Sequence, residues 1–354
     1  MTGVVAFSYE GLPVRVVFGL GARWDLADEL DRLGLNQVVL ITSGSSRAEA
    51  DGLAALLDHR LTWRVDGVRR HVPTELAEEV TADALRVGAD GVVTLGGGSA
   101  TGLGKVLALS GLPLVAVPTT YAGSEMTPIW GTTSGGRKVT GRDTAVVPRT
   151  VVYDPELTFG LPLLTTAASG MNALAHCLEA LWAVGASPLS SPLALEGARA
   201  MVEALPAIVA APTDAKARSR ALVAACQAGM ALATAGAGLH HRLCHVLGGR
   251  YDLPHAETHA ALLSHVVAFN EPVLGPLAAR MAVAVGAGRA STGVHDLAVR
   301  LGLVTSLGEL GMPEEAVDAV AAEVAADPPP NPRPVDEGGL RCVLRAAWEG
   351  DGPG

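Results

Sequence analysis

The sequence of 354 residues predicts an α/β N-terminal half with a mostly parallel sheet, followed by an all-helical C-terminal half. Up to about residue 158, short β-branched runs alternate with amphipathic helical patterns, which is typical of a parallel sheet covered by helices on both faces. Beyond residue 161 the strand patterns stop and helical periodicity takes over. The length also suits two domains, which we expect at residues 1–158 and 159–354.

The individual elements follow from these patterns in chain order. Strands are expected at residues 14–18, 38–42, 62–65, 91–95 and 114–117, then a hairpin around Lys138 and a last strand at 146–153. Helices are expected at 25–33, in the segment ending at Leu56, and at 73–87. The C-terminal half shows helical periodicity at residues 163–183, 191–209, 214–237, 257–270, 274–287, 291–302, 313–326 and 337–348.

Composition and charge exclude several classes of protein. The net charge of −10, without any basic block, argues against a partner that is a nucleic acid. No segment is long and apolar enough to predict a membrane span, and no basic residue precedes an apolar run at the N-terminus. The four cysteines form no CxxC pair, which favours reduced thiols in a cytoplasmic protein.

Two loops carry the signature of a nucleotide site. The first, Gly96-Gly97-Gly98-Ser99, follows a strand and opens a helix, so its backbone can approach a diphosphate at the helix N-terminus. The pattern is neither GxGxxG nor a Walker loop, and a tight turn without a ligand is the alternative. The second loop follows the next strand, where ligands bind in doubly wound sheets. Further expected contacts to NADH or NADPH are Ser43, Thr101, Thr119, Thr120, Tyr121 and Ser124.

Histidines concentrate in the C-terminal half, where six of the ten lie between residues 240 and 265. His241 and His245 are four residues apart, as are Asn172 and His176, so each pair shares one face of a helix. His255 follows a proline, where the chain can turn back toward the first pair. Converging imidazoles can hold a metal ion or transfer protons near neutral pH, whereas scattered surface histidines would do neither.

Taken together, these motifs resemble those of one known superfamily. The order of a GGGS loop, a PTT…GSE loop, a strand ending in Asp154-Pro155, Asn-x3-His and His-x3-His…Pro-His resembles the iron-containing alcohol dehydrogenase superfamily. Its details resemble the maleylacetate reductase branch, notably the runs PTTYAGSEMTP, SGMNALAH, GLHH, DLPHAETH and NPRP. The resemblance implies a dehydroquinate-synthase-like fold, NADH or NADPH as cofactor, and a small dicarboxylate substrate. It also leads us to expect a homodimer.

The position of Asn172 bears on the metal. Typical members of the superfamily carry an aspartate there as a ligand, and an amide removes a full negative charge from the site. Asn172, His176, His241 and His255 then resemble a degenerate metal site, and the resemblance implies reduction without a metal. A three-imidazole zinc site is the alternative.

The resemblance also implies chemistry on a carbon–carbon double bond conjugated to a ketone. We expect His245 and His241 to stabilise the enolate and to supply the proton. Lys138 and Arg142 are candidates to bind the substrate carboxylates, with Arg242 and Arg333 as further candidates, although each of these cations could equally be a solvated surface group.

Other functions stay open on the sequence alone. A metal-dependent alcohol or polyol dehydrogenase is one, and a dehydroquinate-synthase-like cyclase is another, although the latter would need more lysine and arginine for a phosphate leaving group. A nucleotide sensor without catalysis would leave the histidines unexplained. Ser43 stands where an acidic residue would repel a 2′-phosphate, so NADH and NADPH both remain possible.

Overall fold

The computed structural model describes residues 7–43, 47–69, 72–134 and 137–354, with the backbone alone for Arg137 and Lys138. The chain forms two compact units. The α/β unit consists of Leu12–Pro162 together with Ala211–Leu222, and the helical unit of Leu163–Ala210 and Val223–Gly354 with the N-terminal segment up to Gly11. Residues 211–222 therefore belong with the sheet. The domain boundary at residue 158 stays a prediction.

The α/β unit is built on a six-stranded sheet in the order β1-β8-β5-β4-β2-β3, and every strand pair in it is parallel. Four strands lie between the edges, and three of these are β2 (Val38–Thr42), β4 (Gly91–Gly96) and β5 (Leu114–Pro118), whose residues are all buried. Strands β1 (Arg15–Phe18) and β3 (Leu61–Asp66) form the edges. The predicted parallel sheet is confirmed.

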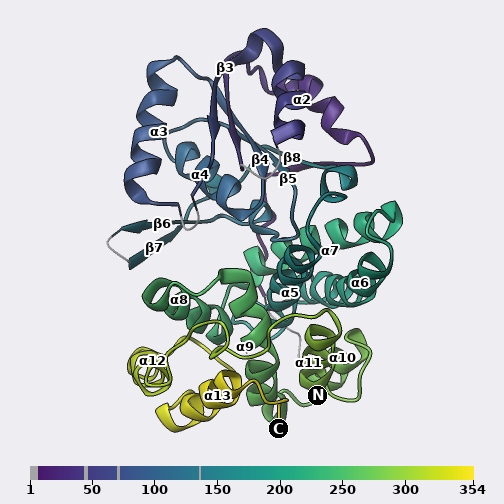
Figure 1. The fold of residues 1–354 in the computed structure, drawn as a ribbon, viewed down its shortest axis with the longest axis vertical. Coiled ribbons are helices and arrows are strands. Elements are labelled where there is room, and N and C mark those ends of the chain that lie inside the picture. Colours follow the sequence, from purple (N-terminus) through teal and green to yellow (C-terminus); the bar gives the residue numbers. More distant parts are fainter. Residues whose placement is uncertain (1–6, 44–46, 70–71, 135–136) are drawn as a thin grey trace. The chain divides into compact units, whose positions relative to one another are not determined.

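Helices cover both faces of this sheet (Figure 1). Helices α1 (Leu26–Leu33) and α2 (Arg47–Leu57) pack on one face, where Leu30 and Leu53 meet Leu40 of β2. Helices α3 (Thr74–Arg86) and α4 (Gly98–Ala108) pack on the other, where Leu103 meets Ile41. Alternate residues of each buried strand thus point into two separate cores, which is why these strands are continuously apolar.

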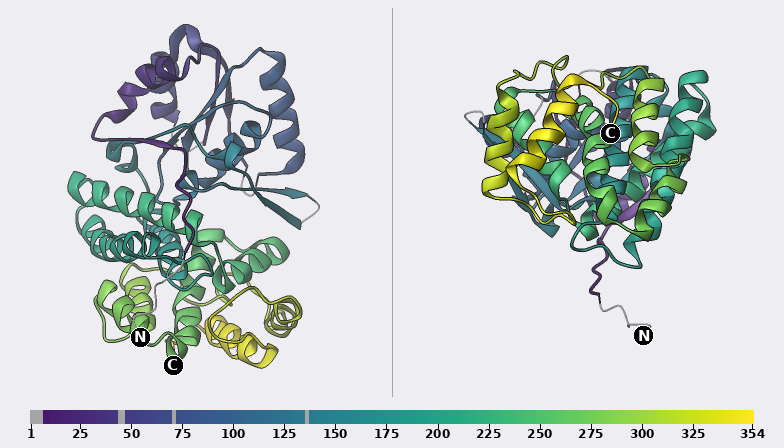
Figure 2. Two further views of the ribbon diagram at one scale, coloured as in Figure 1. Left: turned by 180° about the vertical axis from the view of Figure 1, so that it is seen from behind. Right: turned by 90° about the horizontal axis from the view of Figure 1, so that it is seen from below.

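The predicted hairpin around Lys138 is present, whereas the last strand begins later than predicted. β6 (Ile129–Ser134) pairs with β7 (Arg137–Arg142) in an antiparallel arm that extends away from the main sheet (Figures 1 and 2). The last strand, expected from residue 146, begins only at β8 (Thr150–Tyr153). The reason is local: the Asp143 carboxylate accepts a hydrogen bond from the Ala145 N–H at 2.8 Å and starts a 3-10 turn instead of a strand.

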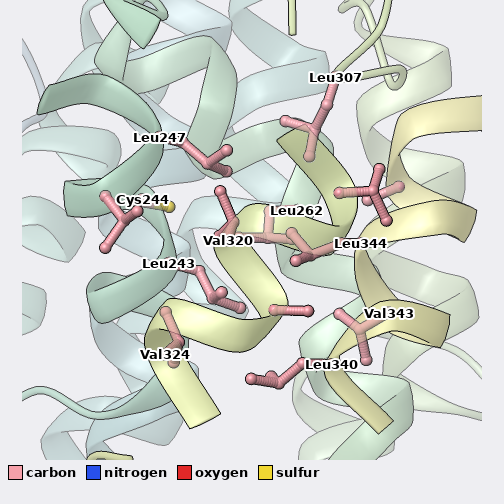
Figure 3. Packing of buried hydrophobic residues seen from close by; sticks show 14 of the residues in the cluster. Leu243, Cys244, Leu247, Leu262, Leu307, Val320, Val324, Leu340, Val343 and Leu344 are labelled. Carbon is pink, nitrogen blue, oxygen red and sulfur yellow. The ribbon is translucent and has the colours of Figure 1, made fainter. Parts of the chain in front are cut away.

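The helical unit contains no strand among its described residues. Its core includes a cluster in which Leu243 and Leu247 of α8 meet Val320 of α12 and Leu344 of α13 (Figure 3). The helices are α5 (Leu163–Ala180), α6 (Ser190–Ala210), α8 (Leu239–Tyr251), α9 (His255–Asn270), α10 (Pro276–Ala284), α11 (Ala290–Arg300), α12 (Ala316–Ala326) and α13 (Glu337–Glu349), with α7 (Ala215–Ala235) shared between the units.

Two further points concern these helices. Short 3-10 turns occupy Ala22–Asp25, Asp58–Arg60, Ser124–Met126, Thr144–Val146, Pro155–Thr158 and Glu271–Val273. Across the described residues, no single helix has the length and apolar character to cross a membrane, and the one pair that passes this test together, α7 with α8, is bent by 102°.

Candidate nucleotide loops and histidine cluster

The two predicted nucleotide loops lie side by side at the carboxyl edge of the sheet. Gly96 ends β4 in register with Pro118 of β5, and the Thr119 N–H donates to the Gly96 carbonyl at 3.0 Å. Ser43 follows β2 at the same edge, where its N–H donates to the Leu95 carbonyl at 3.2 Å. The parallel register thus gathers residues from three separate segments.

Two glycines of the first loop are required by their surroundings. Gly96 has a φ of +153°, and a Cβ there would lie 2.8 Å from the Ser43 Oγ. A Cβ on Gly97 would lie 2.9 Å from the Thr120 Cγ2. Helix α4 then begins with no side chain capping it from Gly97, so its first N–H groups remain available to an anion. The strand, tight turn and uncapped helix form the geometry that binds a diphosphate.

The predicted contacts divide by exposure. Gly98 is exposed, and Gly97, Ser99, Thr120 and Ser124 are half-buried. The Ser124 Oγ has no hydrogen-bond partner among the described residues. It lies beside the first loop, 3.9 Å from the position that a Cβ on Gly98 would occupy. A ligand bound at this loop would supply the missing hydrogen bond.

Three other predicted contacts are buried in the α/β unit: Thr101, Thr119 and Tyr121. Tyr121 is fully buried, and its hydroxyl accepts a hydrogen bond from Nη1 of Arg218 at 3.0 Å. Tyr121 therefore supports the second loop from within the protein, and Arg218 is a residue that the sequence patterns did not reveal.

A buried lysine also holds this loop. Nζ of Lys105, on α4, donates to the carbonyl oxygens of Ser124, Thr127 and Ile129 at 2.6–2.7 Å. Three carbonyls can accept only if the amine carries three protons, so the geometry requires an ammonium ion. Burial lowers the pKa of Lys105 to about 7, and nearby Glu125 opposes this shift. We missed this role, although Lys105 is the one charged residue in α4.

Six imidazoles gather in the helical unit: one from α5, three from α8 and two from α9. The rings of His176 and His241 are stacked with their centres 5.0 Å apart, and His259 packs edge-on against His241, also at 5.0 Å. His255 lies 4.5 Å from His259 and 6.3 Å from His245. The predicted convergence of His176, His241, His245 and His255 is present, and it includes His240 and His259 as well.

Burial sets the charge of the cluster. His176, His240, His241 and His259 are buried, whereas His245 and His255 are half-buried. Burial lowers the pKa of His240 to about 3 and moves the pKa values of His176 and His259 well below 6.5, and the neighbouring imidazoles add to the last two shifts. These three rings are therefore neutral near pH 7. His240 Nε2 and His259 Nδ1 hydrogen-bond each other at 2.9 Å.

Glu179 of α5 supplies the negative charge in this cluster. It is fully buried, and one carboxylate oxygen contacts Nδ1 of His241. Burial raises the pKa of Glu179, but the charge and hydrogen bond of His241 outweigh burial and bring that pKa down to about 2. The sequence carried one signal for it, because Glu179 is the single charged residue in the 18 residues of α5.

Asn172 and His176 lie one turn apart on α5, as their spacing predicts. Both are buried, and in the described part of the chain neither the Asn172 Oδ1 nor the His176 Nδ1 has a hydrogen-bond partner. The same is true of the His241 Nε2. Three buried polar atoms from two helices thus lack partners, which is the mark of a site for a polar ligand.

The structure does not assign a substrate to the four cations that were predicted to bind its carboxylates. Arg142 is exposed on β7 of the α/β unit, and the side chain of Lys138, on the same strand, lies outside the described part of the chain. Arg242 is 3.8 Å from Asp327, an exposed pair. Arg333 donates to the Phe269 carbonyl at 3.0 Å and covers the ring of that residue. The roles of all four stay predictions.

These two features, an uncapped glycine loop on a parallel sheet and a histidine cluster on a helical unit, define a known class. The chain belongs to the iron-containing alcohol dehydrogenase family: the model of iron-containing alcohol dehydrogenase matches residues 13–155, and that of the family's C-terminal part matches residues 166–348. It is an oxidoreductase that uses NADH or NADPH.

Relatives with names narrow this class. Maleylacetate reductase of Burkholderia cepacia is 46% identical over 349 residues, which cover 98% of this chain and 99% of the relative. The crystal structure of maleylacetate reductase from Rhizobium sp. strain MTP-10005 superposes with a TM-score of 0.94 at 44% identity, covering 99% of this chain and all of the other. A putative alcohol dehydrogenase from Ralstonia eutropha JMP134 superposes with a TM-score of 0.97 at 45% identity, with the same coverage.

Proposed function

We propose that this chain is a maleylacetate reductase, which reduces the carbon–carbon double bond of maleylacetate to give 3-oxoadipate. Similarity to maleylacetate reductases over 98% of the chain supports the substrate. The observation in the structure that carries the chemistry is His241: Glu179 occupies its Nδ1, while its Nε2 is left without a partner in the described residues. Such a ring is prepared to exchange a proton with a ligand.

The reaction balances with a hydride and a proton. NADH or NADPH held at the loop of Gly97, Gly98 and Ser99 would supply a hydride from its C4–H bond to the carbon β to the ketone, and the electrons of the double bond would move onto the ketone oxygen as an enolate. His245 donates a hydrogen bond to that oxygen, which lowers the energy of the developing charge. His241, protonated on both nitrogens, then delivers its Nε2 proton to the adjacent carbon, which restores the ketone and leaves the ring with its Nδ1 proton. The proton returns to His241 from solvent.

Deuterium transfer tests the position of reduction. With NADH deuterated at C4, addition to the double bond places deuterium on the carbon β to the ketone, and the product keeps its carbonyl group. An alcohol dehydrogenase would instead place deuterium on a new carbinol carbon. Proton and carbon NMR of the product distinguish the two, and deuterium at the carbinol carbon would refute the proposal.

We further propose that this reaction needs no metal ion. The positions that match the family's ligands are Asn172, His176, His241 and His255, where an amide stands in place of the aspartate of typical members, so that no ligand carries a full negative charge. The ligand atoms of these three histidines do not all lie within 4.8 Å of one another. Among the described residues, the set that does is His240, Cys244 and His259, where the first and last already hydrogen-bond each other. The donor set therefore does not fit a metal.

Assembly and location are part of the same proposal. The exposed edge strand β1 carries Val16 and Phe18, each 41% exposed, and exposed apolar edges of sheets are usually covered. We infer a homodimer, which light scattering would reveal as twice the chain mass and which a monomer in dilute solution would contradict. None of the four cysteines, all of which lie in the described part of the chain, forms a disulfide bond, which supports a cytoplasmic location beside the NADH and NADPH pools.

A further inference from the structure

One buried carboxylate connects helix α5 to the first turn of helix α8. Oε1 of Glu179 accepts a hydrogen bond from the backbone N–H of His240 at 2.7 Å, and Oε2 contacts Nδ1 of His241. The backbone N–H of Gly238 is a further donor to this carboxylate. A single side chain thus fixes both the start of α8 and the ring of its third residue.

The backbone of α8 is shaped for this contact. Gly238, the residue before the helix, supplies no side-chain cap of its own. A Cβ on Gly238 would lie 3.2 Å from Oε1 of Glu179, so only glycine leaves the carboxylate its present approach without displacing a neighbour. The negative charge of Glu179 meets the positive end of the α8 dipole. Glu179 therefore takes the place of a local capping residue.

The same contact decides which nitrogen of His241 holds a proton. Because a carboxylate only accepts hydrogen bonds, His241 must carry a proton on Nδ1. The stacked ring of His176 and the edge of His259 confine the imidazole on two sides, each with its ring centre 5.0 Å away. Nε2 is then the nitrogen left to exchange a proton, and it has no partner within the described residues.

We propose that Glu179 is a positioning residue for the reduction: it acts through His241, by holding the proton on Nδ1 and leaving Nε2 to serve as the proton donor. This inference rests on the proposed role of His241. A carboxylate behind a reacting imidazole fixes its tautomer and orientation in this way.

A double-mutant cycle tests the proposal. Kinetics with NADH and maleylacetate are compared for the wild type, Glu179→Gln, His241→Ala and the double variant. We expect Glu179→Gln to lower kcat about 10- to 100-fold with little change in the KM for NADH. In the His241→Ala background it should lower kcat no further, because residues that act as a unit are not additive. Glu203→Gln, an exposed carboxylate on α6, is the matched control.

The outcomes separate the two proposals. If His241→Ala lowers kcat but Glu179→Gln multiplies that loss, Glu179 acts independently of His241 and the positioning role is wrong. A Glu179→Gln variant with normal kcat and only a lower Tm also overturns it, because the carboxylate would then be purely structural. A His241→Ala variant with the kcat of the wild type contradicts the proton-donor role in the proposed function, and the role of Glu179 with it.

A measurement on the unaltered protein covers the case in which Glu179→Gln does not fold. Nitrogen-15 NMR of the enzyme labelled at histidine distinguishes the Nδ1–H from the Nε2–H tautomer, and His241→Ala identifies the signal. We expect a proton on Nδ1 of His241. A neutral ring protonated on Nε2 alone would overturn the inference. Glu179→Asp, which retains the charge but withdraws it by one methylene, should retain more of the Tm than of the kcat.

Discussion

His245 and His255 differ from the other four imidazoles of the cluster, because they alone are half-exposed. Exposure allows a ring to meet a substrate, whereas the neutral, buried His240 and His259 are committed to each other. At the scale of single residues, we therefore propose that the cluster divides into an inner pair, His240 and His259, with a structural role and outer rings with a chemical role. His241, buried but with an unpartnered Nε2 in the described part of the chain, belongs with the outer rings.

The first prediction concerns His245. Replacement by alanine should lower kcat about 100-fold, because one donor to the enolate oxygen is lost. The Tm should change little, since the side chain is not part of the buried core. Steady-state kinetics and a thermal melt on the same preparation check this. A destabilised variant that keeps normal turnover per folded molecule would show that His245 is structural.

A second prediction concerns acid stability. Burial and the nearby His295 lower the pKa of His265 from 6.5 to about 4, while Asp351 opposes the shift. As the pH falls, the unfolded chain therefore binds this proton first. The stabilisation is complete above about pH 6.5 and is lost toward pH 4, which amounts to about 2 kcal/mol between pH 7 and pH 5.

Urea unfolding at pH 7 and at pH 5 tests the direction of this change in the free energy of unfolding. His265→Gln should lose less free energy of unfolding than the wild type on acidification, because the glutamine takes up no proton. His59→Gln, at an exposed histidine, serves as the control and should follow the wild type. Equal losses in all three proteins would show that His265 does not set the acid limit.

Some residues of the candidate site could be predicted from the sequence, and others could not. His176, His241 and His245 were predictable from four-residue helical spacing, and His255 was predictable because it follows Pro254, where the chain can turn back. Glu179 and Lys105 were not, because the partners of a buried charge lie on other segments: α8 for Glu179 and the loop after β5 for Lys105. A lone charge in an otherwise uncharged helix was the available signal, and it indicates burial without naming the partner.

At the scale of elements, the glycine loop and the N-terminus of α4 together form the proposed diphosphate site, which gives a third prediction. Gly97→Asp should raise the KM for NADH steeply, because a Cβ there meets Thr120 at 2.9 Å and a carboxylate would face the diphosphate. Gly160→Asp makes the same change at an exposed site with no atom within 4 Å and should leave the KM unaltered. Normal NADH binding by the Gly97 variant would show that the nucleotide binds elsewhere.

Strands that are short, continuous apolar runs were predicted correctly. Residues 38–42 and 91–95 are apolar runs that correspond to the buried β2 and β4. The prediction of a strand from residue 146 was wrong, because a side-chain hydrogen bond of Asp143 overrides the β-branched run. Strand β6 was not predicted as a separate element, because its residues are mostly half-buried and show no alternation of apolar and polar side chains.

At the scale of the whole molecule, the chain has the fold of its family, but one residue at the position of the family's metal ligands differs. The sheet, the glycine loop and the helical unit match the iron-containing alcohol dehydrogenases over most of the chain. The site has a neutral amide at Asn172, where typical members of the family carry an aspartate, and the buried carboxylate of Glu179 contacts His241. Reduction of a conjugated double bond suits this change, because its enolate needs a hydrogen-bond donor and a proton more than a Lewis acid.

The most direct test follows NADH consumption with maleylacetate before and after chelation, with the metal content measured on the same sample. The account predicts rapid NADH oxidation that EDTA treatment and dialysis leave unchanged, in protein with far less than one metal ion per chain. Activity lost on chelation and restored by iron or zinc would contradict the metal-free mechanism. No oxidation of NADH or NADPH with maleylacetate would contradict the proposed function itself.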